Sequence, residues 1–139
     1  MHGLIRIFAA SWHMSKKLNI GVLGCANIAK KSMIPAIKNL ADHFNLLGIA
    51  SRSPSKADEF CNIFNTKAYY RYTDLIENQN LDAIYIPLPN SLHKEWIEKS
   101  ILQGLHVLVE KSMACKLVDV VHLNRLAAKS GLLLMENFQ

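Results

Sequence analysis

The sequence predicts an α/β fold with a doubly wound parallel sheet, and two observations carry that prediction. Short apolar runs of strand length alternate with segments of helical spacing from residue 18 onward. The helical segments are long enough to serve as crossovers between parallel strands. Crossovers of this kind are right-handed and place helices against the sheet.

The first strand is predicted at 18–23, an apolar run that suits burial on both faces. Gly24 then begins the pattern G-x-A-x-x-A, with Ala26 in the middle and Ala29 at the end. This is the dinucleotide fingerprint with alanine in its middle place, where small residues let the backbone approach a pyrophosphate. Taken alone, the turn also fits a plain corner between a strand and a helix. The turn residues that we assign to a cofactor are Gly24, Ala26, Asn27 and Ile28.

Proline marks the next two helices. A helix over 28–40 contains Pro35, which removes a helical hydrogen bond and predicts a kink or restart near Met33. A second strand at 45–50 leads to Ser53 and Pro54, which we expect as N-cap and first residue of a helix that runs to about Phe64.

The remaining elements continue the alternation. Thr73 is expected to cap a brief helix, and Gly104 and Gly131 are expected to end the two later helices. We expect strands at 68–70, 81–88, 106–109 and 132–135, and helices at 74–76, 90–103 and 117–130.

Ligands of open parallel sheets bind outside the carboxyl ends of the strands, where the strand order reverses. Five segments meet that condition, and Pro87, Asn90, His93 and Glu110 in or beside them join the expected cofactor contacts. The segments are 24–28, 51–53, 87–90, 110–112 and 136–137.

The end of the second strand indicates which dinucleotide binds. An acidic residue there would bind a ribose 2′-hydroxyl, whereas arginine accommodates a 2′-phosphate. The chain has Ser51, Arg52 and Ser53, with Lys56 one turn later. This set predicts NADP over NAD. A solvated loop arginine is the alternative.

Lys111 follows Glu110 at the end of the fifth strand and is the candidate catalytic residue. Its ammonium can donate a proton to a developing alkoxide. The alternative is a surface ion pair, which usually contributes little. His93 can orient a substrate or only cap its helix, and the sequence alone favours the second role. Trp96 and the tyrosines at 69, 70 and 72 are read as packing residues.

Composition limits the function classes. A chain of 139 residues that is 50% apolar suits one globular domain. The net charge of +5 comes from scattered lysines and arginines, so we expect no nucleic-acid partner. Three distant cysteines without a CxxC pair predict free thiols, no bound metal and a cytoplasmic protein. Residues 1–16 are expected to be a disordered leader, because Arg6 interrupts their apolar run and the run is too short to span a membrane.

Five segments together resemble the Gfo/Idh/MocA oxidoreductases over residues 17–139. They are GVLGCANIA at 21–29, GIASRSPSKA at 48–57, YIPLPNSLH at 85–93, GLHVLVEKS at 104–112 and LLLMENF at 132–138. The sequences of these segments are most similar to those of the NADP-dependent sugar ketoreductases of that family. The resemblance implies a Rossmann domain that binds the cofactor of a hydride-transferring enzyme.

The resemblance also implies roles for single residues. Lys111 matches the lysine of the family's E-K-P motif, which contacts the nicotinamide ribose and the substrate, and Asn90 and His93 match a segment at the nicotinamide end. Two departures stand out. Ser112 replaces the proline after that lysine, and Ala26 replaces the commoner middle glycine.

Family members have a second α/β domain, which holds the substrate pocket and the dimer face, and the chain stops before it. We therefore expect the cofactor domain, 17–139, of an enzyme that transfers hydride between NADPH and a carbonyl of a sugar, nucleotide sugar or related polyol. The intact enzyme is expected to be a homo-oligomer without membrane contact. A non-catalytic NADP-binding module or truncated family remnant is the rival, and Ser112 favours it. A methyltransferase fits less well, since Arg52 stands where an acidic residue would hold the ribose.

Overall fold

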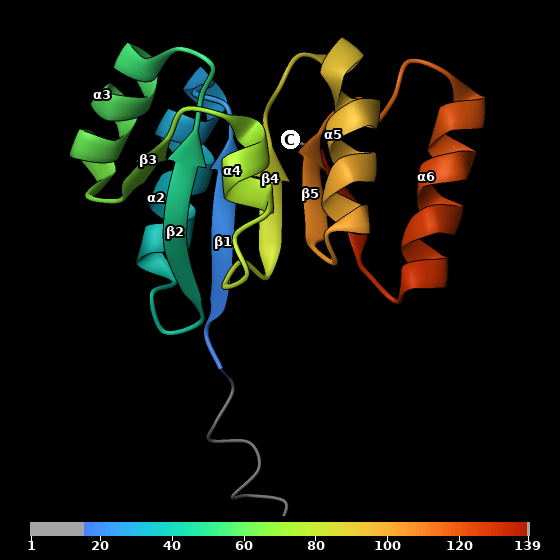
Figure 1. Ribbon diagram of the computed structural model, residues 1–139, viewed down its shortest axis with the longest axis horizontal. Coiled ribbons are helices and arrows are strands. Elements are labelled where there is room, and N and C mark those ends of the chain that lie inside the picture. The colour runs from blue at the N-terminus through green and yellow to red at the C-terminus, as the bar shows by residue number, and fades with distance from the viewer. Residues whose placement is uncertain (1–15, 139) are drawn as a thin grey trace, which may run out of the picture.

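The computed structural model of the protein describes residues 16–138, which form a six-stranded sheet in the order β3-β2-β1-β4-β5-β6 (Figure 1). All neighbouring strands run parallel. The predicted fold class is therefore confirmed. The strands are β1 (Leu18–Leu23), β2 (Phe44–Ala50), β3 (Lys67–Tyr69), β4 (Ala83–Ile86), β5 (His106–Glu110) and β6 (Leu134–Asn137). The helices are η1 (Ala29–Met33), α2 (Ile34–Asn39), α3 (Pro54–Phe64), α4 (Tyr72–Ile76), α5 (Asn90–Leu102) and α6 (Leu117–Ser130). The expected leader at 1–16 lies, except for Lys16, outside the described residues.

The sheet separates two apolar cores, and neighbouring strand residues contribute to opposite ones. Ile84 belongs to the core under α4, α5 and α6, whereas Tyr85 belongs to the core under η1, α2 and α3. This follows from the two-residue period of a strand. Both residues are 1% exposed. The order reverses between β1 and β4, so the carboxyl ends of these strands form the switch point where parallel sheets bind ligands.

Pro35 restarts its helix, as predicted. Residues Ala29–Met33 form a π-helix, and the N–H of Ile34 donates to the carbonyl of Ala29, five residues back. The α-helix α2 then starts with Pro35 in its first turn. Because proline has no N–H, the chain changes its hydrogen-bond spacing at this point.

Several predicted boundaries are corrected. Helix α4 begins at Tyr72 with Arg71 in the N-cap position, so the prediction that Thr73 caps it is wrong. Tyr72 is 7% exposed, and its packing in the core places it in the first turn of the helix, one residue before Thr73. Ser53 occupies the predicted N-cap of α3 but its side chain makes no capping bond. Strand β6 lies two residues later than expected, because Val107 pairs with Leu134. Gly131 ends α6 in the left-handed conformation, as predicted.

One face of the β5 and β6 half of the sheet is open among the described residues. Leu108 and Met135 are paired in register, and Met135 is 57% exposed. Figure 1 places α5 and α6 together over this half of the sheet, with α2 and α3 at its other half. No helix within residues 16–138 is long and apolar enough to cross a membrane.

Candidate functional site: a cleft at the switch point

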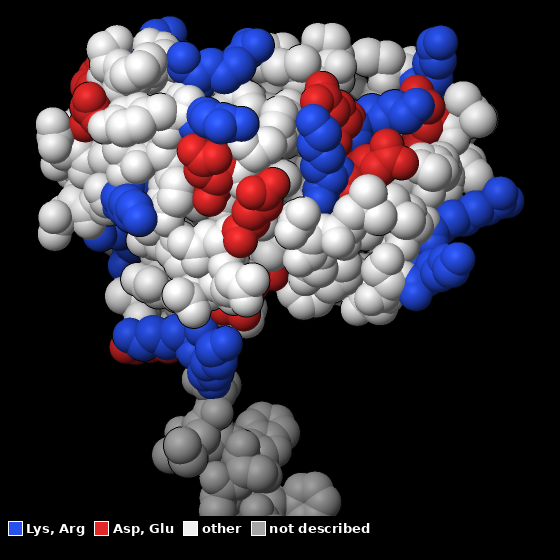
Figure 2. All heavy atoms as spheres, viewed as in Figure 1, with Lys and Arg blue, Asp and Glu red and all other residues white. Residues whose placement is uncertain are grey.

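A cleft of about 350 Å³ lies at the carboxyl ends of β1, β2 and β4. Figure 2 shows Lys and Arg side chains along the upper rim of the molecule, the rim toward which the strands run in Figure 1. Arg52 and Lys56 line the cleft, and its described lining contains no carboxylate. The cleft therefore favours an anion. Its lining residues are Gly24, Cys25, Ala26, Ser51, Arg52, Ser53, Lys56, Tyr72, Pro87, Leu88 and Pro89.

Gly24 shapes the floor of the cleft. Its φ is +108°, a backbone conformation that other residues rarely adopt. A Cβ at this position would lie 2.8 Å from Cδ2 of Leu88, so the turn leaves no room for a side chain. The N–H of Gly24 donates to the carbonyl of Ala50 at 2.8 Å, which ties the turn to the end of β2. The glycine turn is thus a narrow cradle that a methyl group would fill, and it fits a closely approaching phosphate.

The end of β2 presents the cations of the cleft. Ser51 is 6% exposed, and its hydroxyl accepts the N–H of Ser53 at 3.1 Å, which fixes the turn around Arg52. The Arg52 guanidinium lies 6.0 Å from the centre of the Tyr72 ring. Tyr72 in turn packs edge-on against Trp96, with ring centres 5.0 Å apart. Arg52 therefore stands on an aromatic support.

Cys25 is a lining residue that the sequence analysis did not assign to the site. Burial raises the pKa of its thiol, against the opposing effects of a hydrogen bond with Ser51 and the charge of Lys56. The thiol donates to the carbonyl of Lys56 at 3.5 Å. Cys25 is therefore a neutral donor that joins the glycine turn to α3. Tyr72 was missed as well, because its place in the cleft depends on contacts between separate elements. Leu88 and Pro89 lie in the predicted segment 87–90 but were not assigned as contacts.

A second polar cluster surrounds the end of β5. The Tyr85 hydroxyl donates to Oε1 of Glu110 at 2.5 Å, and Nδ2 of Asn137 donates to the same oxygen at 2.8 Å. Burial raises the pKa of Tyr85, and the bond to Glu110 raises it further, so the hydroxyl stays protonated. Three adjacent strands thus hold the carboxylate that precedes Lys111. Lys111 itself is exposed, with Nζ 5.3 Å from the centre of the Phe138 ring.

His93 is fully buried behind the cleft. Its Nε2 lies 2.6 Å from the carbonyl oxygen of Leu88, and its Nδ1 lies 2.6 Å from that of Ser112. The ring therefore connects the turn after β4 with the turn after β5. Its predicted contact with a cofactor stays a prediction, and the observed bonds give it a holding role.

The predicted contacts divide into two groups. The structure brings seven of them together in the cleft: Gly24, Ala26, Ser51, Arg52, Ser53, Lys56 and Pro87. Asn27, Ile28, Asn90, His93, Glu110 and Lys111 do not line it. Asn27 and Asn90 are exposed, at the glycine turn and at the first residue of α5. Of the second group, His93 on α5 contacts the turn after Lys111 through Ser112, and Glu110 directly precedes Lys111.

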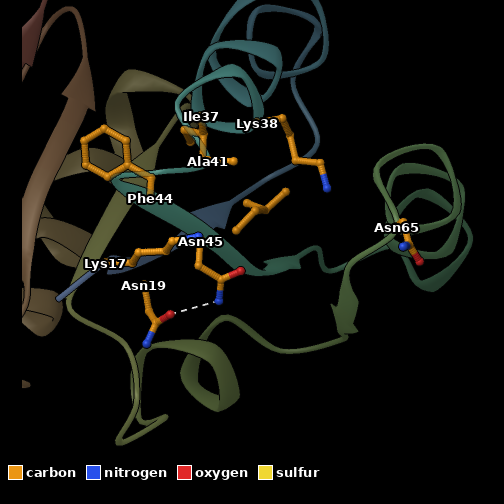
Figure 3. A pocket seen from close by; sticks show the side chains of 9 residues that line it. Lys17, Asn19, Ile37, Lys38, Ala41, Phe44, Asn45 and Asn65 are labelled. Atoms are coloured by element: carbon orange, nitrogen blue, oxygen red, sulfur yellow. Dashed lines mark hydrogen bonds between the residues drawn. The ribbon is translucent and has the colours of Figure 1, made fainter.

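A larger cavity, of about 440 Å³, lies at the other end of the strands, where β1 and β2 begin (Figure 3). There Asn45 donates to Asn19 at 2.9 Å, and Lys38 donates at 2.9 Å to the carbonyl of Phe64, the last residue of α3. Helix C-terminal ends carry partial negative charge, and the Lys38 ammonium is already used to satisfy one. This cavity is therefore a poorer phosphate site than the cleft at the switch point.

Comparison with known proteins identifies the fold and the class of site. The family model GFO_IDH_MocA, described as an oxidoreductase family with an NAD-binding Rossmann fold, matches residues 18–138. A dTDP-3,4-didehydro-2,6-dideoxy-alpha-D-glucose 3-reductase from Saccharopolyspora spinosa is 41% identical over 125 residues, 90% of this chain and 37% of that protein. A D-xylose 1-dehydrogenase (NADP(+)) from Haloferax volcanii is 37% identical over 119 residues, 85% of this chain and 36% of that protein. The chain spans little more than a third of the length of these relatives.

Solved structures give the same picture. A 3-ketoreductase from Actinomadura kijaniata, in complex with NADP, is similar with a TM-score of 0.84 and 38% identity, over 88% of this chain and 39% of that chain. An NAD-binding oxidoreductase from Klebsiella pneumoniae has a TM-score of 0.82 at 22% identity, over 88% of this chain and 34% of that one, and shows the shared fold.

Proposed function

The chain belongs to the Gfo/Idh/MocA family of oxidoreductases, and from that premise we propose that residues 17–139 are the NADP-binding domain of a sugar oxidoreductase. One observation carries the choice of NADP. Arg52 stands at the end of β2, beside the glycine cradle, with Ser51, Ser53 and Lys56 around it and no carboxylate in the described lining. A 2′-phosphate fits this set, whereas a free ribose diol would find no carboxylate among the described lining residues. The relative from Actinomadura kijaniata, solved with NADP, supports the proposal.

In the proposed complex the two parts of the cleft bind different groups. The turn at 24–28 holds the pyrophosphate, because Gly24 allows its tight bend and small residues line it. Arg52 and Lys56 pair with the 2′-phosphate, and Ser51 and Ser53 donate hydroxyl hydrogen bonds to it. Tyr72 supports Arg52 from below. When bound, NADPH would supply the hydride for reduction of a carbonyl, and NADP would accept one in the reverse direction.

Lys111 is the proposed proton donor. Its exposed ammonium lies at the carboxyl end of β5, where the reacting end of a dinucleotide reaches in a sheet of this kind. It can donate a proton to the alkoxide that forms when a carbonyl accepts hydride. Glu110 precedes its turn and His93 contacts it through Ser112. Asn90 is proposed to contact the cofactor from the start of α5.

The substrate is proposed to be a sugar or nucleotide sugar with a reacting carbonyl or hydroxyl. The relatives named as a dTDP-sugar 3-reductase and as a xylose dehydrogenase support that class. We also propose that the enzyme is cytoplasmic and homo-oligomeric and binds neither membranes nor nucleic acid. The free state of Cys25, Cys61 and Cys115 is in keeping with a reducing compartment.

A non-catalytic NADP-binding module is the second candidate, and Ser112 favours it because it stands where the family's proline follows the lysine. Two assays test both candidates. Fluorescence titration of the chain with NADPH and with NADH tests the cofactor site, and the proposal expects NADPH to bind more tightly. Oxidation of NADPH that depends on an added keto sugar would then establish an enzyme and exclude the non-catalytic module, whereas failure to bind NADPH would contradict both candidates.

A further inference from the structure

We infer that Glu136 is a positioning residue for Lys111. It acts through the backbone of the turn that follows Lys111. This inference rests on the proposed role of Lys111 in the NADP site. It concerns what sets the direction of the lysine in a chain that has Ser112 where the family's proline would constrain the turn.

The peptide unit between Ser112 and Met113 is held at both ends by side chains from different elements. Its carbonyl oxygen, on Ser112, lies 2.6 Å from Nδ1 of His93 on α5. Its N–H, on Met113, donates to Oε2 of Glu136 on β6 at 2.7 Å. With Nδ1 carrying a proton, His93 donates to this carbonyl, and the two bonds at opposite ends of one planar group then fix the orientation of its plane, because rotation would break both.

His93 and Glu136, the two side chains that contact this peptide unit, differ in how far each can be replaced without disturbing the fold. The His93 ring is fully buried and its Nε2 also lies 2.6 Å from the carbonyl oxygen of Leu88, so it has a structural role besides this one. Glu136 is exposed, and the structure assigns its carboxylate to the Met113 amide alone among its side-chain hydrogen bonds. An acceptor that is charged makes a strong bond to a backbone N–H. Glu136 is therefore the group that can be removed without opening a core.

Both sides of Lys111 are thus anchored. Before it, Glu110 is bonded to Tyr85 and Asn137. After it, the 112–113 peptide is held as described, and the side chain of Met113 is buried in the core under α5 and α6. Only the exposed side chains of Lys111 and Ser112 face away from this anchored backbone. Removal of the Glu136 carboxylate frees one end of the peptide and lets the lysine sample other directions.

A double-mutant cycle on NADPH affinity tests the inference. Lys111→Ala is expected to weaken NADPH binding, and Glu136→Ala to weaken it about threefold to tenfold, the range of one hydrogen bond. In the Lys111→Ala background the same Glu136→Ala change is expected to have less than about a twofold effect, because the positioned group is gone. Glu136→Gln keeps an acceptor oxygen and is expected to recover most of the affinity. Glu77→Ala, which removes an exposed glutamate at the end of α4, is the matched control for charge.

The outcomes separate this inference from the proposed function. If Glu136→Ala binds NADPH like the unaltered chain, or weakens binding equally with and without Lys111, the positioning role is overturned and the cofactor proposal stands. If Lys111→Ala does not change the affinity for NADPH, the positioning role of Glu136 is overturned. A lower NADPH affinity in Arg52→Ala would still support the NADP site. Failure of the unaltered chain to bind NADPH contradicts the proposed function itself. Thermal melting of each variant shows whether a loss of affinity comes from unfolding.

Discussion

The Arg52 guanidinium lies 6.0 Å from the centre of the Tyr72 ring, on the helix that follows β3. This pair joins the turn after β2 to α4, and Trp96 on α5 supports the ring from its edge. Arginine has a long, flexible side chain, and an aromatic face limits the directions it samples. The cation that we propose to bind the 2′-phosphate is therefore supported by a ring of the protein itself.

Replacement of Tyr72 should show whether NADPH binding depends on the support that its ring gives to Arg52. Tyr72→Leu removes the aromatic face and should weaken NADPH binding about twofold to fivefold, the range of an exposed cation–π contact. Tyr72→Phe keeps the face and should bind nearly as well as the unaltered chain. Titration of both variants by fluorescence makes the comparison. Equal affinities for the leucine and phenylalanine variants would show that the ring does not support Arg52.

Gly24→Ala should block the cofactor cradle. The new methyl group would lie 2.8 Å from Leu88 at a φ of +108°, so the turn must shift. Strain of this kind costs about 1–3 kcal/mol. Gly131→Ala is the control, because Gly131 has a φ of +67° but no atom within 4 Å of the added Cβ. Both variants should have a lower melting temperature than the unaltered chain, but only Gly24→Ala should lose NADPH affinity. Retained affinity in Gly24→Ala would refute the cradle.

The buried thiol of Cys61 should make stability depend on alkaline pH. Burial, together with the neighbouring Cys25, raises its pKa from 9.0 to about 11. A group whose pKa is raised by folding stabilises the fold below its unfolded pKa, and that contribution is lost as pH rises through the folded pKa. The melting temperature should therefore fall between pH 9 and about 11.

Cys61→Ala should make this alkaline decline shallower, whereas Cys115→Ala, which removes an exposed thiol, should leave it unchanged. Melting curves measured across the pH range in a reducing buffer test the difference. Identical slopes for the two variants would show that Cys61 ionises normally in the folded state.

The open edge at β6 should make the chain self-associate. Leu133, Met135 and Phe138 are 63%, 57% and 80% exposed. Met135 lies in the edge strand β6, and Leu133 and Phe138 directly flank it. Apolar side chains that gather on an edge strand promote association. Met135→Lys should reduce the associated fraction in light scattering, because a charge at the edge opposes pairing. Ile63→Lys, at a position 52% exposed on α3, is the control. A monodisperse unaltered chain at high concentration would contradict the expectation.

Local chemistry explains what the sequence could predict. Pro35 restarts a helix and Gly24 makes a tight turn because their backbone properties act within a few residues. Arg52 was predicted at the ligand cleft because it follows β2, and it lines the cleft at the switch point. Tyr72, however, was read as packing, since its support of Arg52 depends on where α4 meets the end of β2.

The same limit applies to the Lys111 turn. His93 was read as a cap or ligand contact, and Glu136 only as a residue at a strand end. Their common target, the peptide unit between Ser112 and Met113, lies far from both in the chain. No local pattern marks such a meeting point, because it is made by the packing of α5 and β6 around β5.

Arg52→Ala in parallel titrations with NADPH and NADH tests the central claim most directly, with Arg125→Ala on the exposed face of α6 as the control. Loss of hydrogen bonds from a charged group should weaken NADPH binding about 10-fold to 100-fold. NADH binding should change little, and Arg125→Ala should preserve the preference for NADPH. Equal losses for both nucleotides, or an unchanged NADPH affinity in Arg52→Ala, would contradict the assignment of the cleft to a 2′-phosphate.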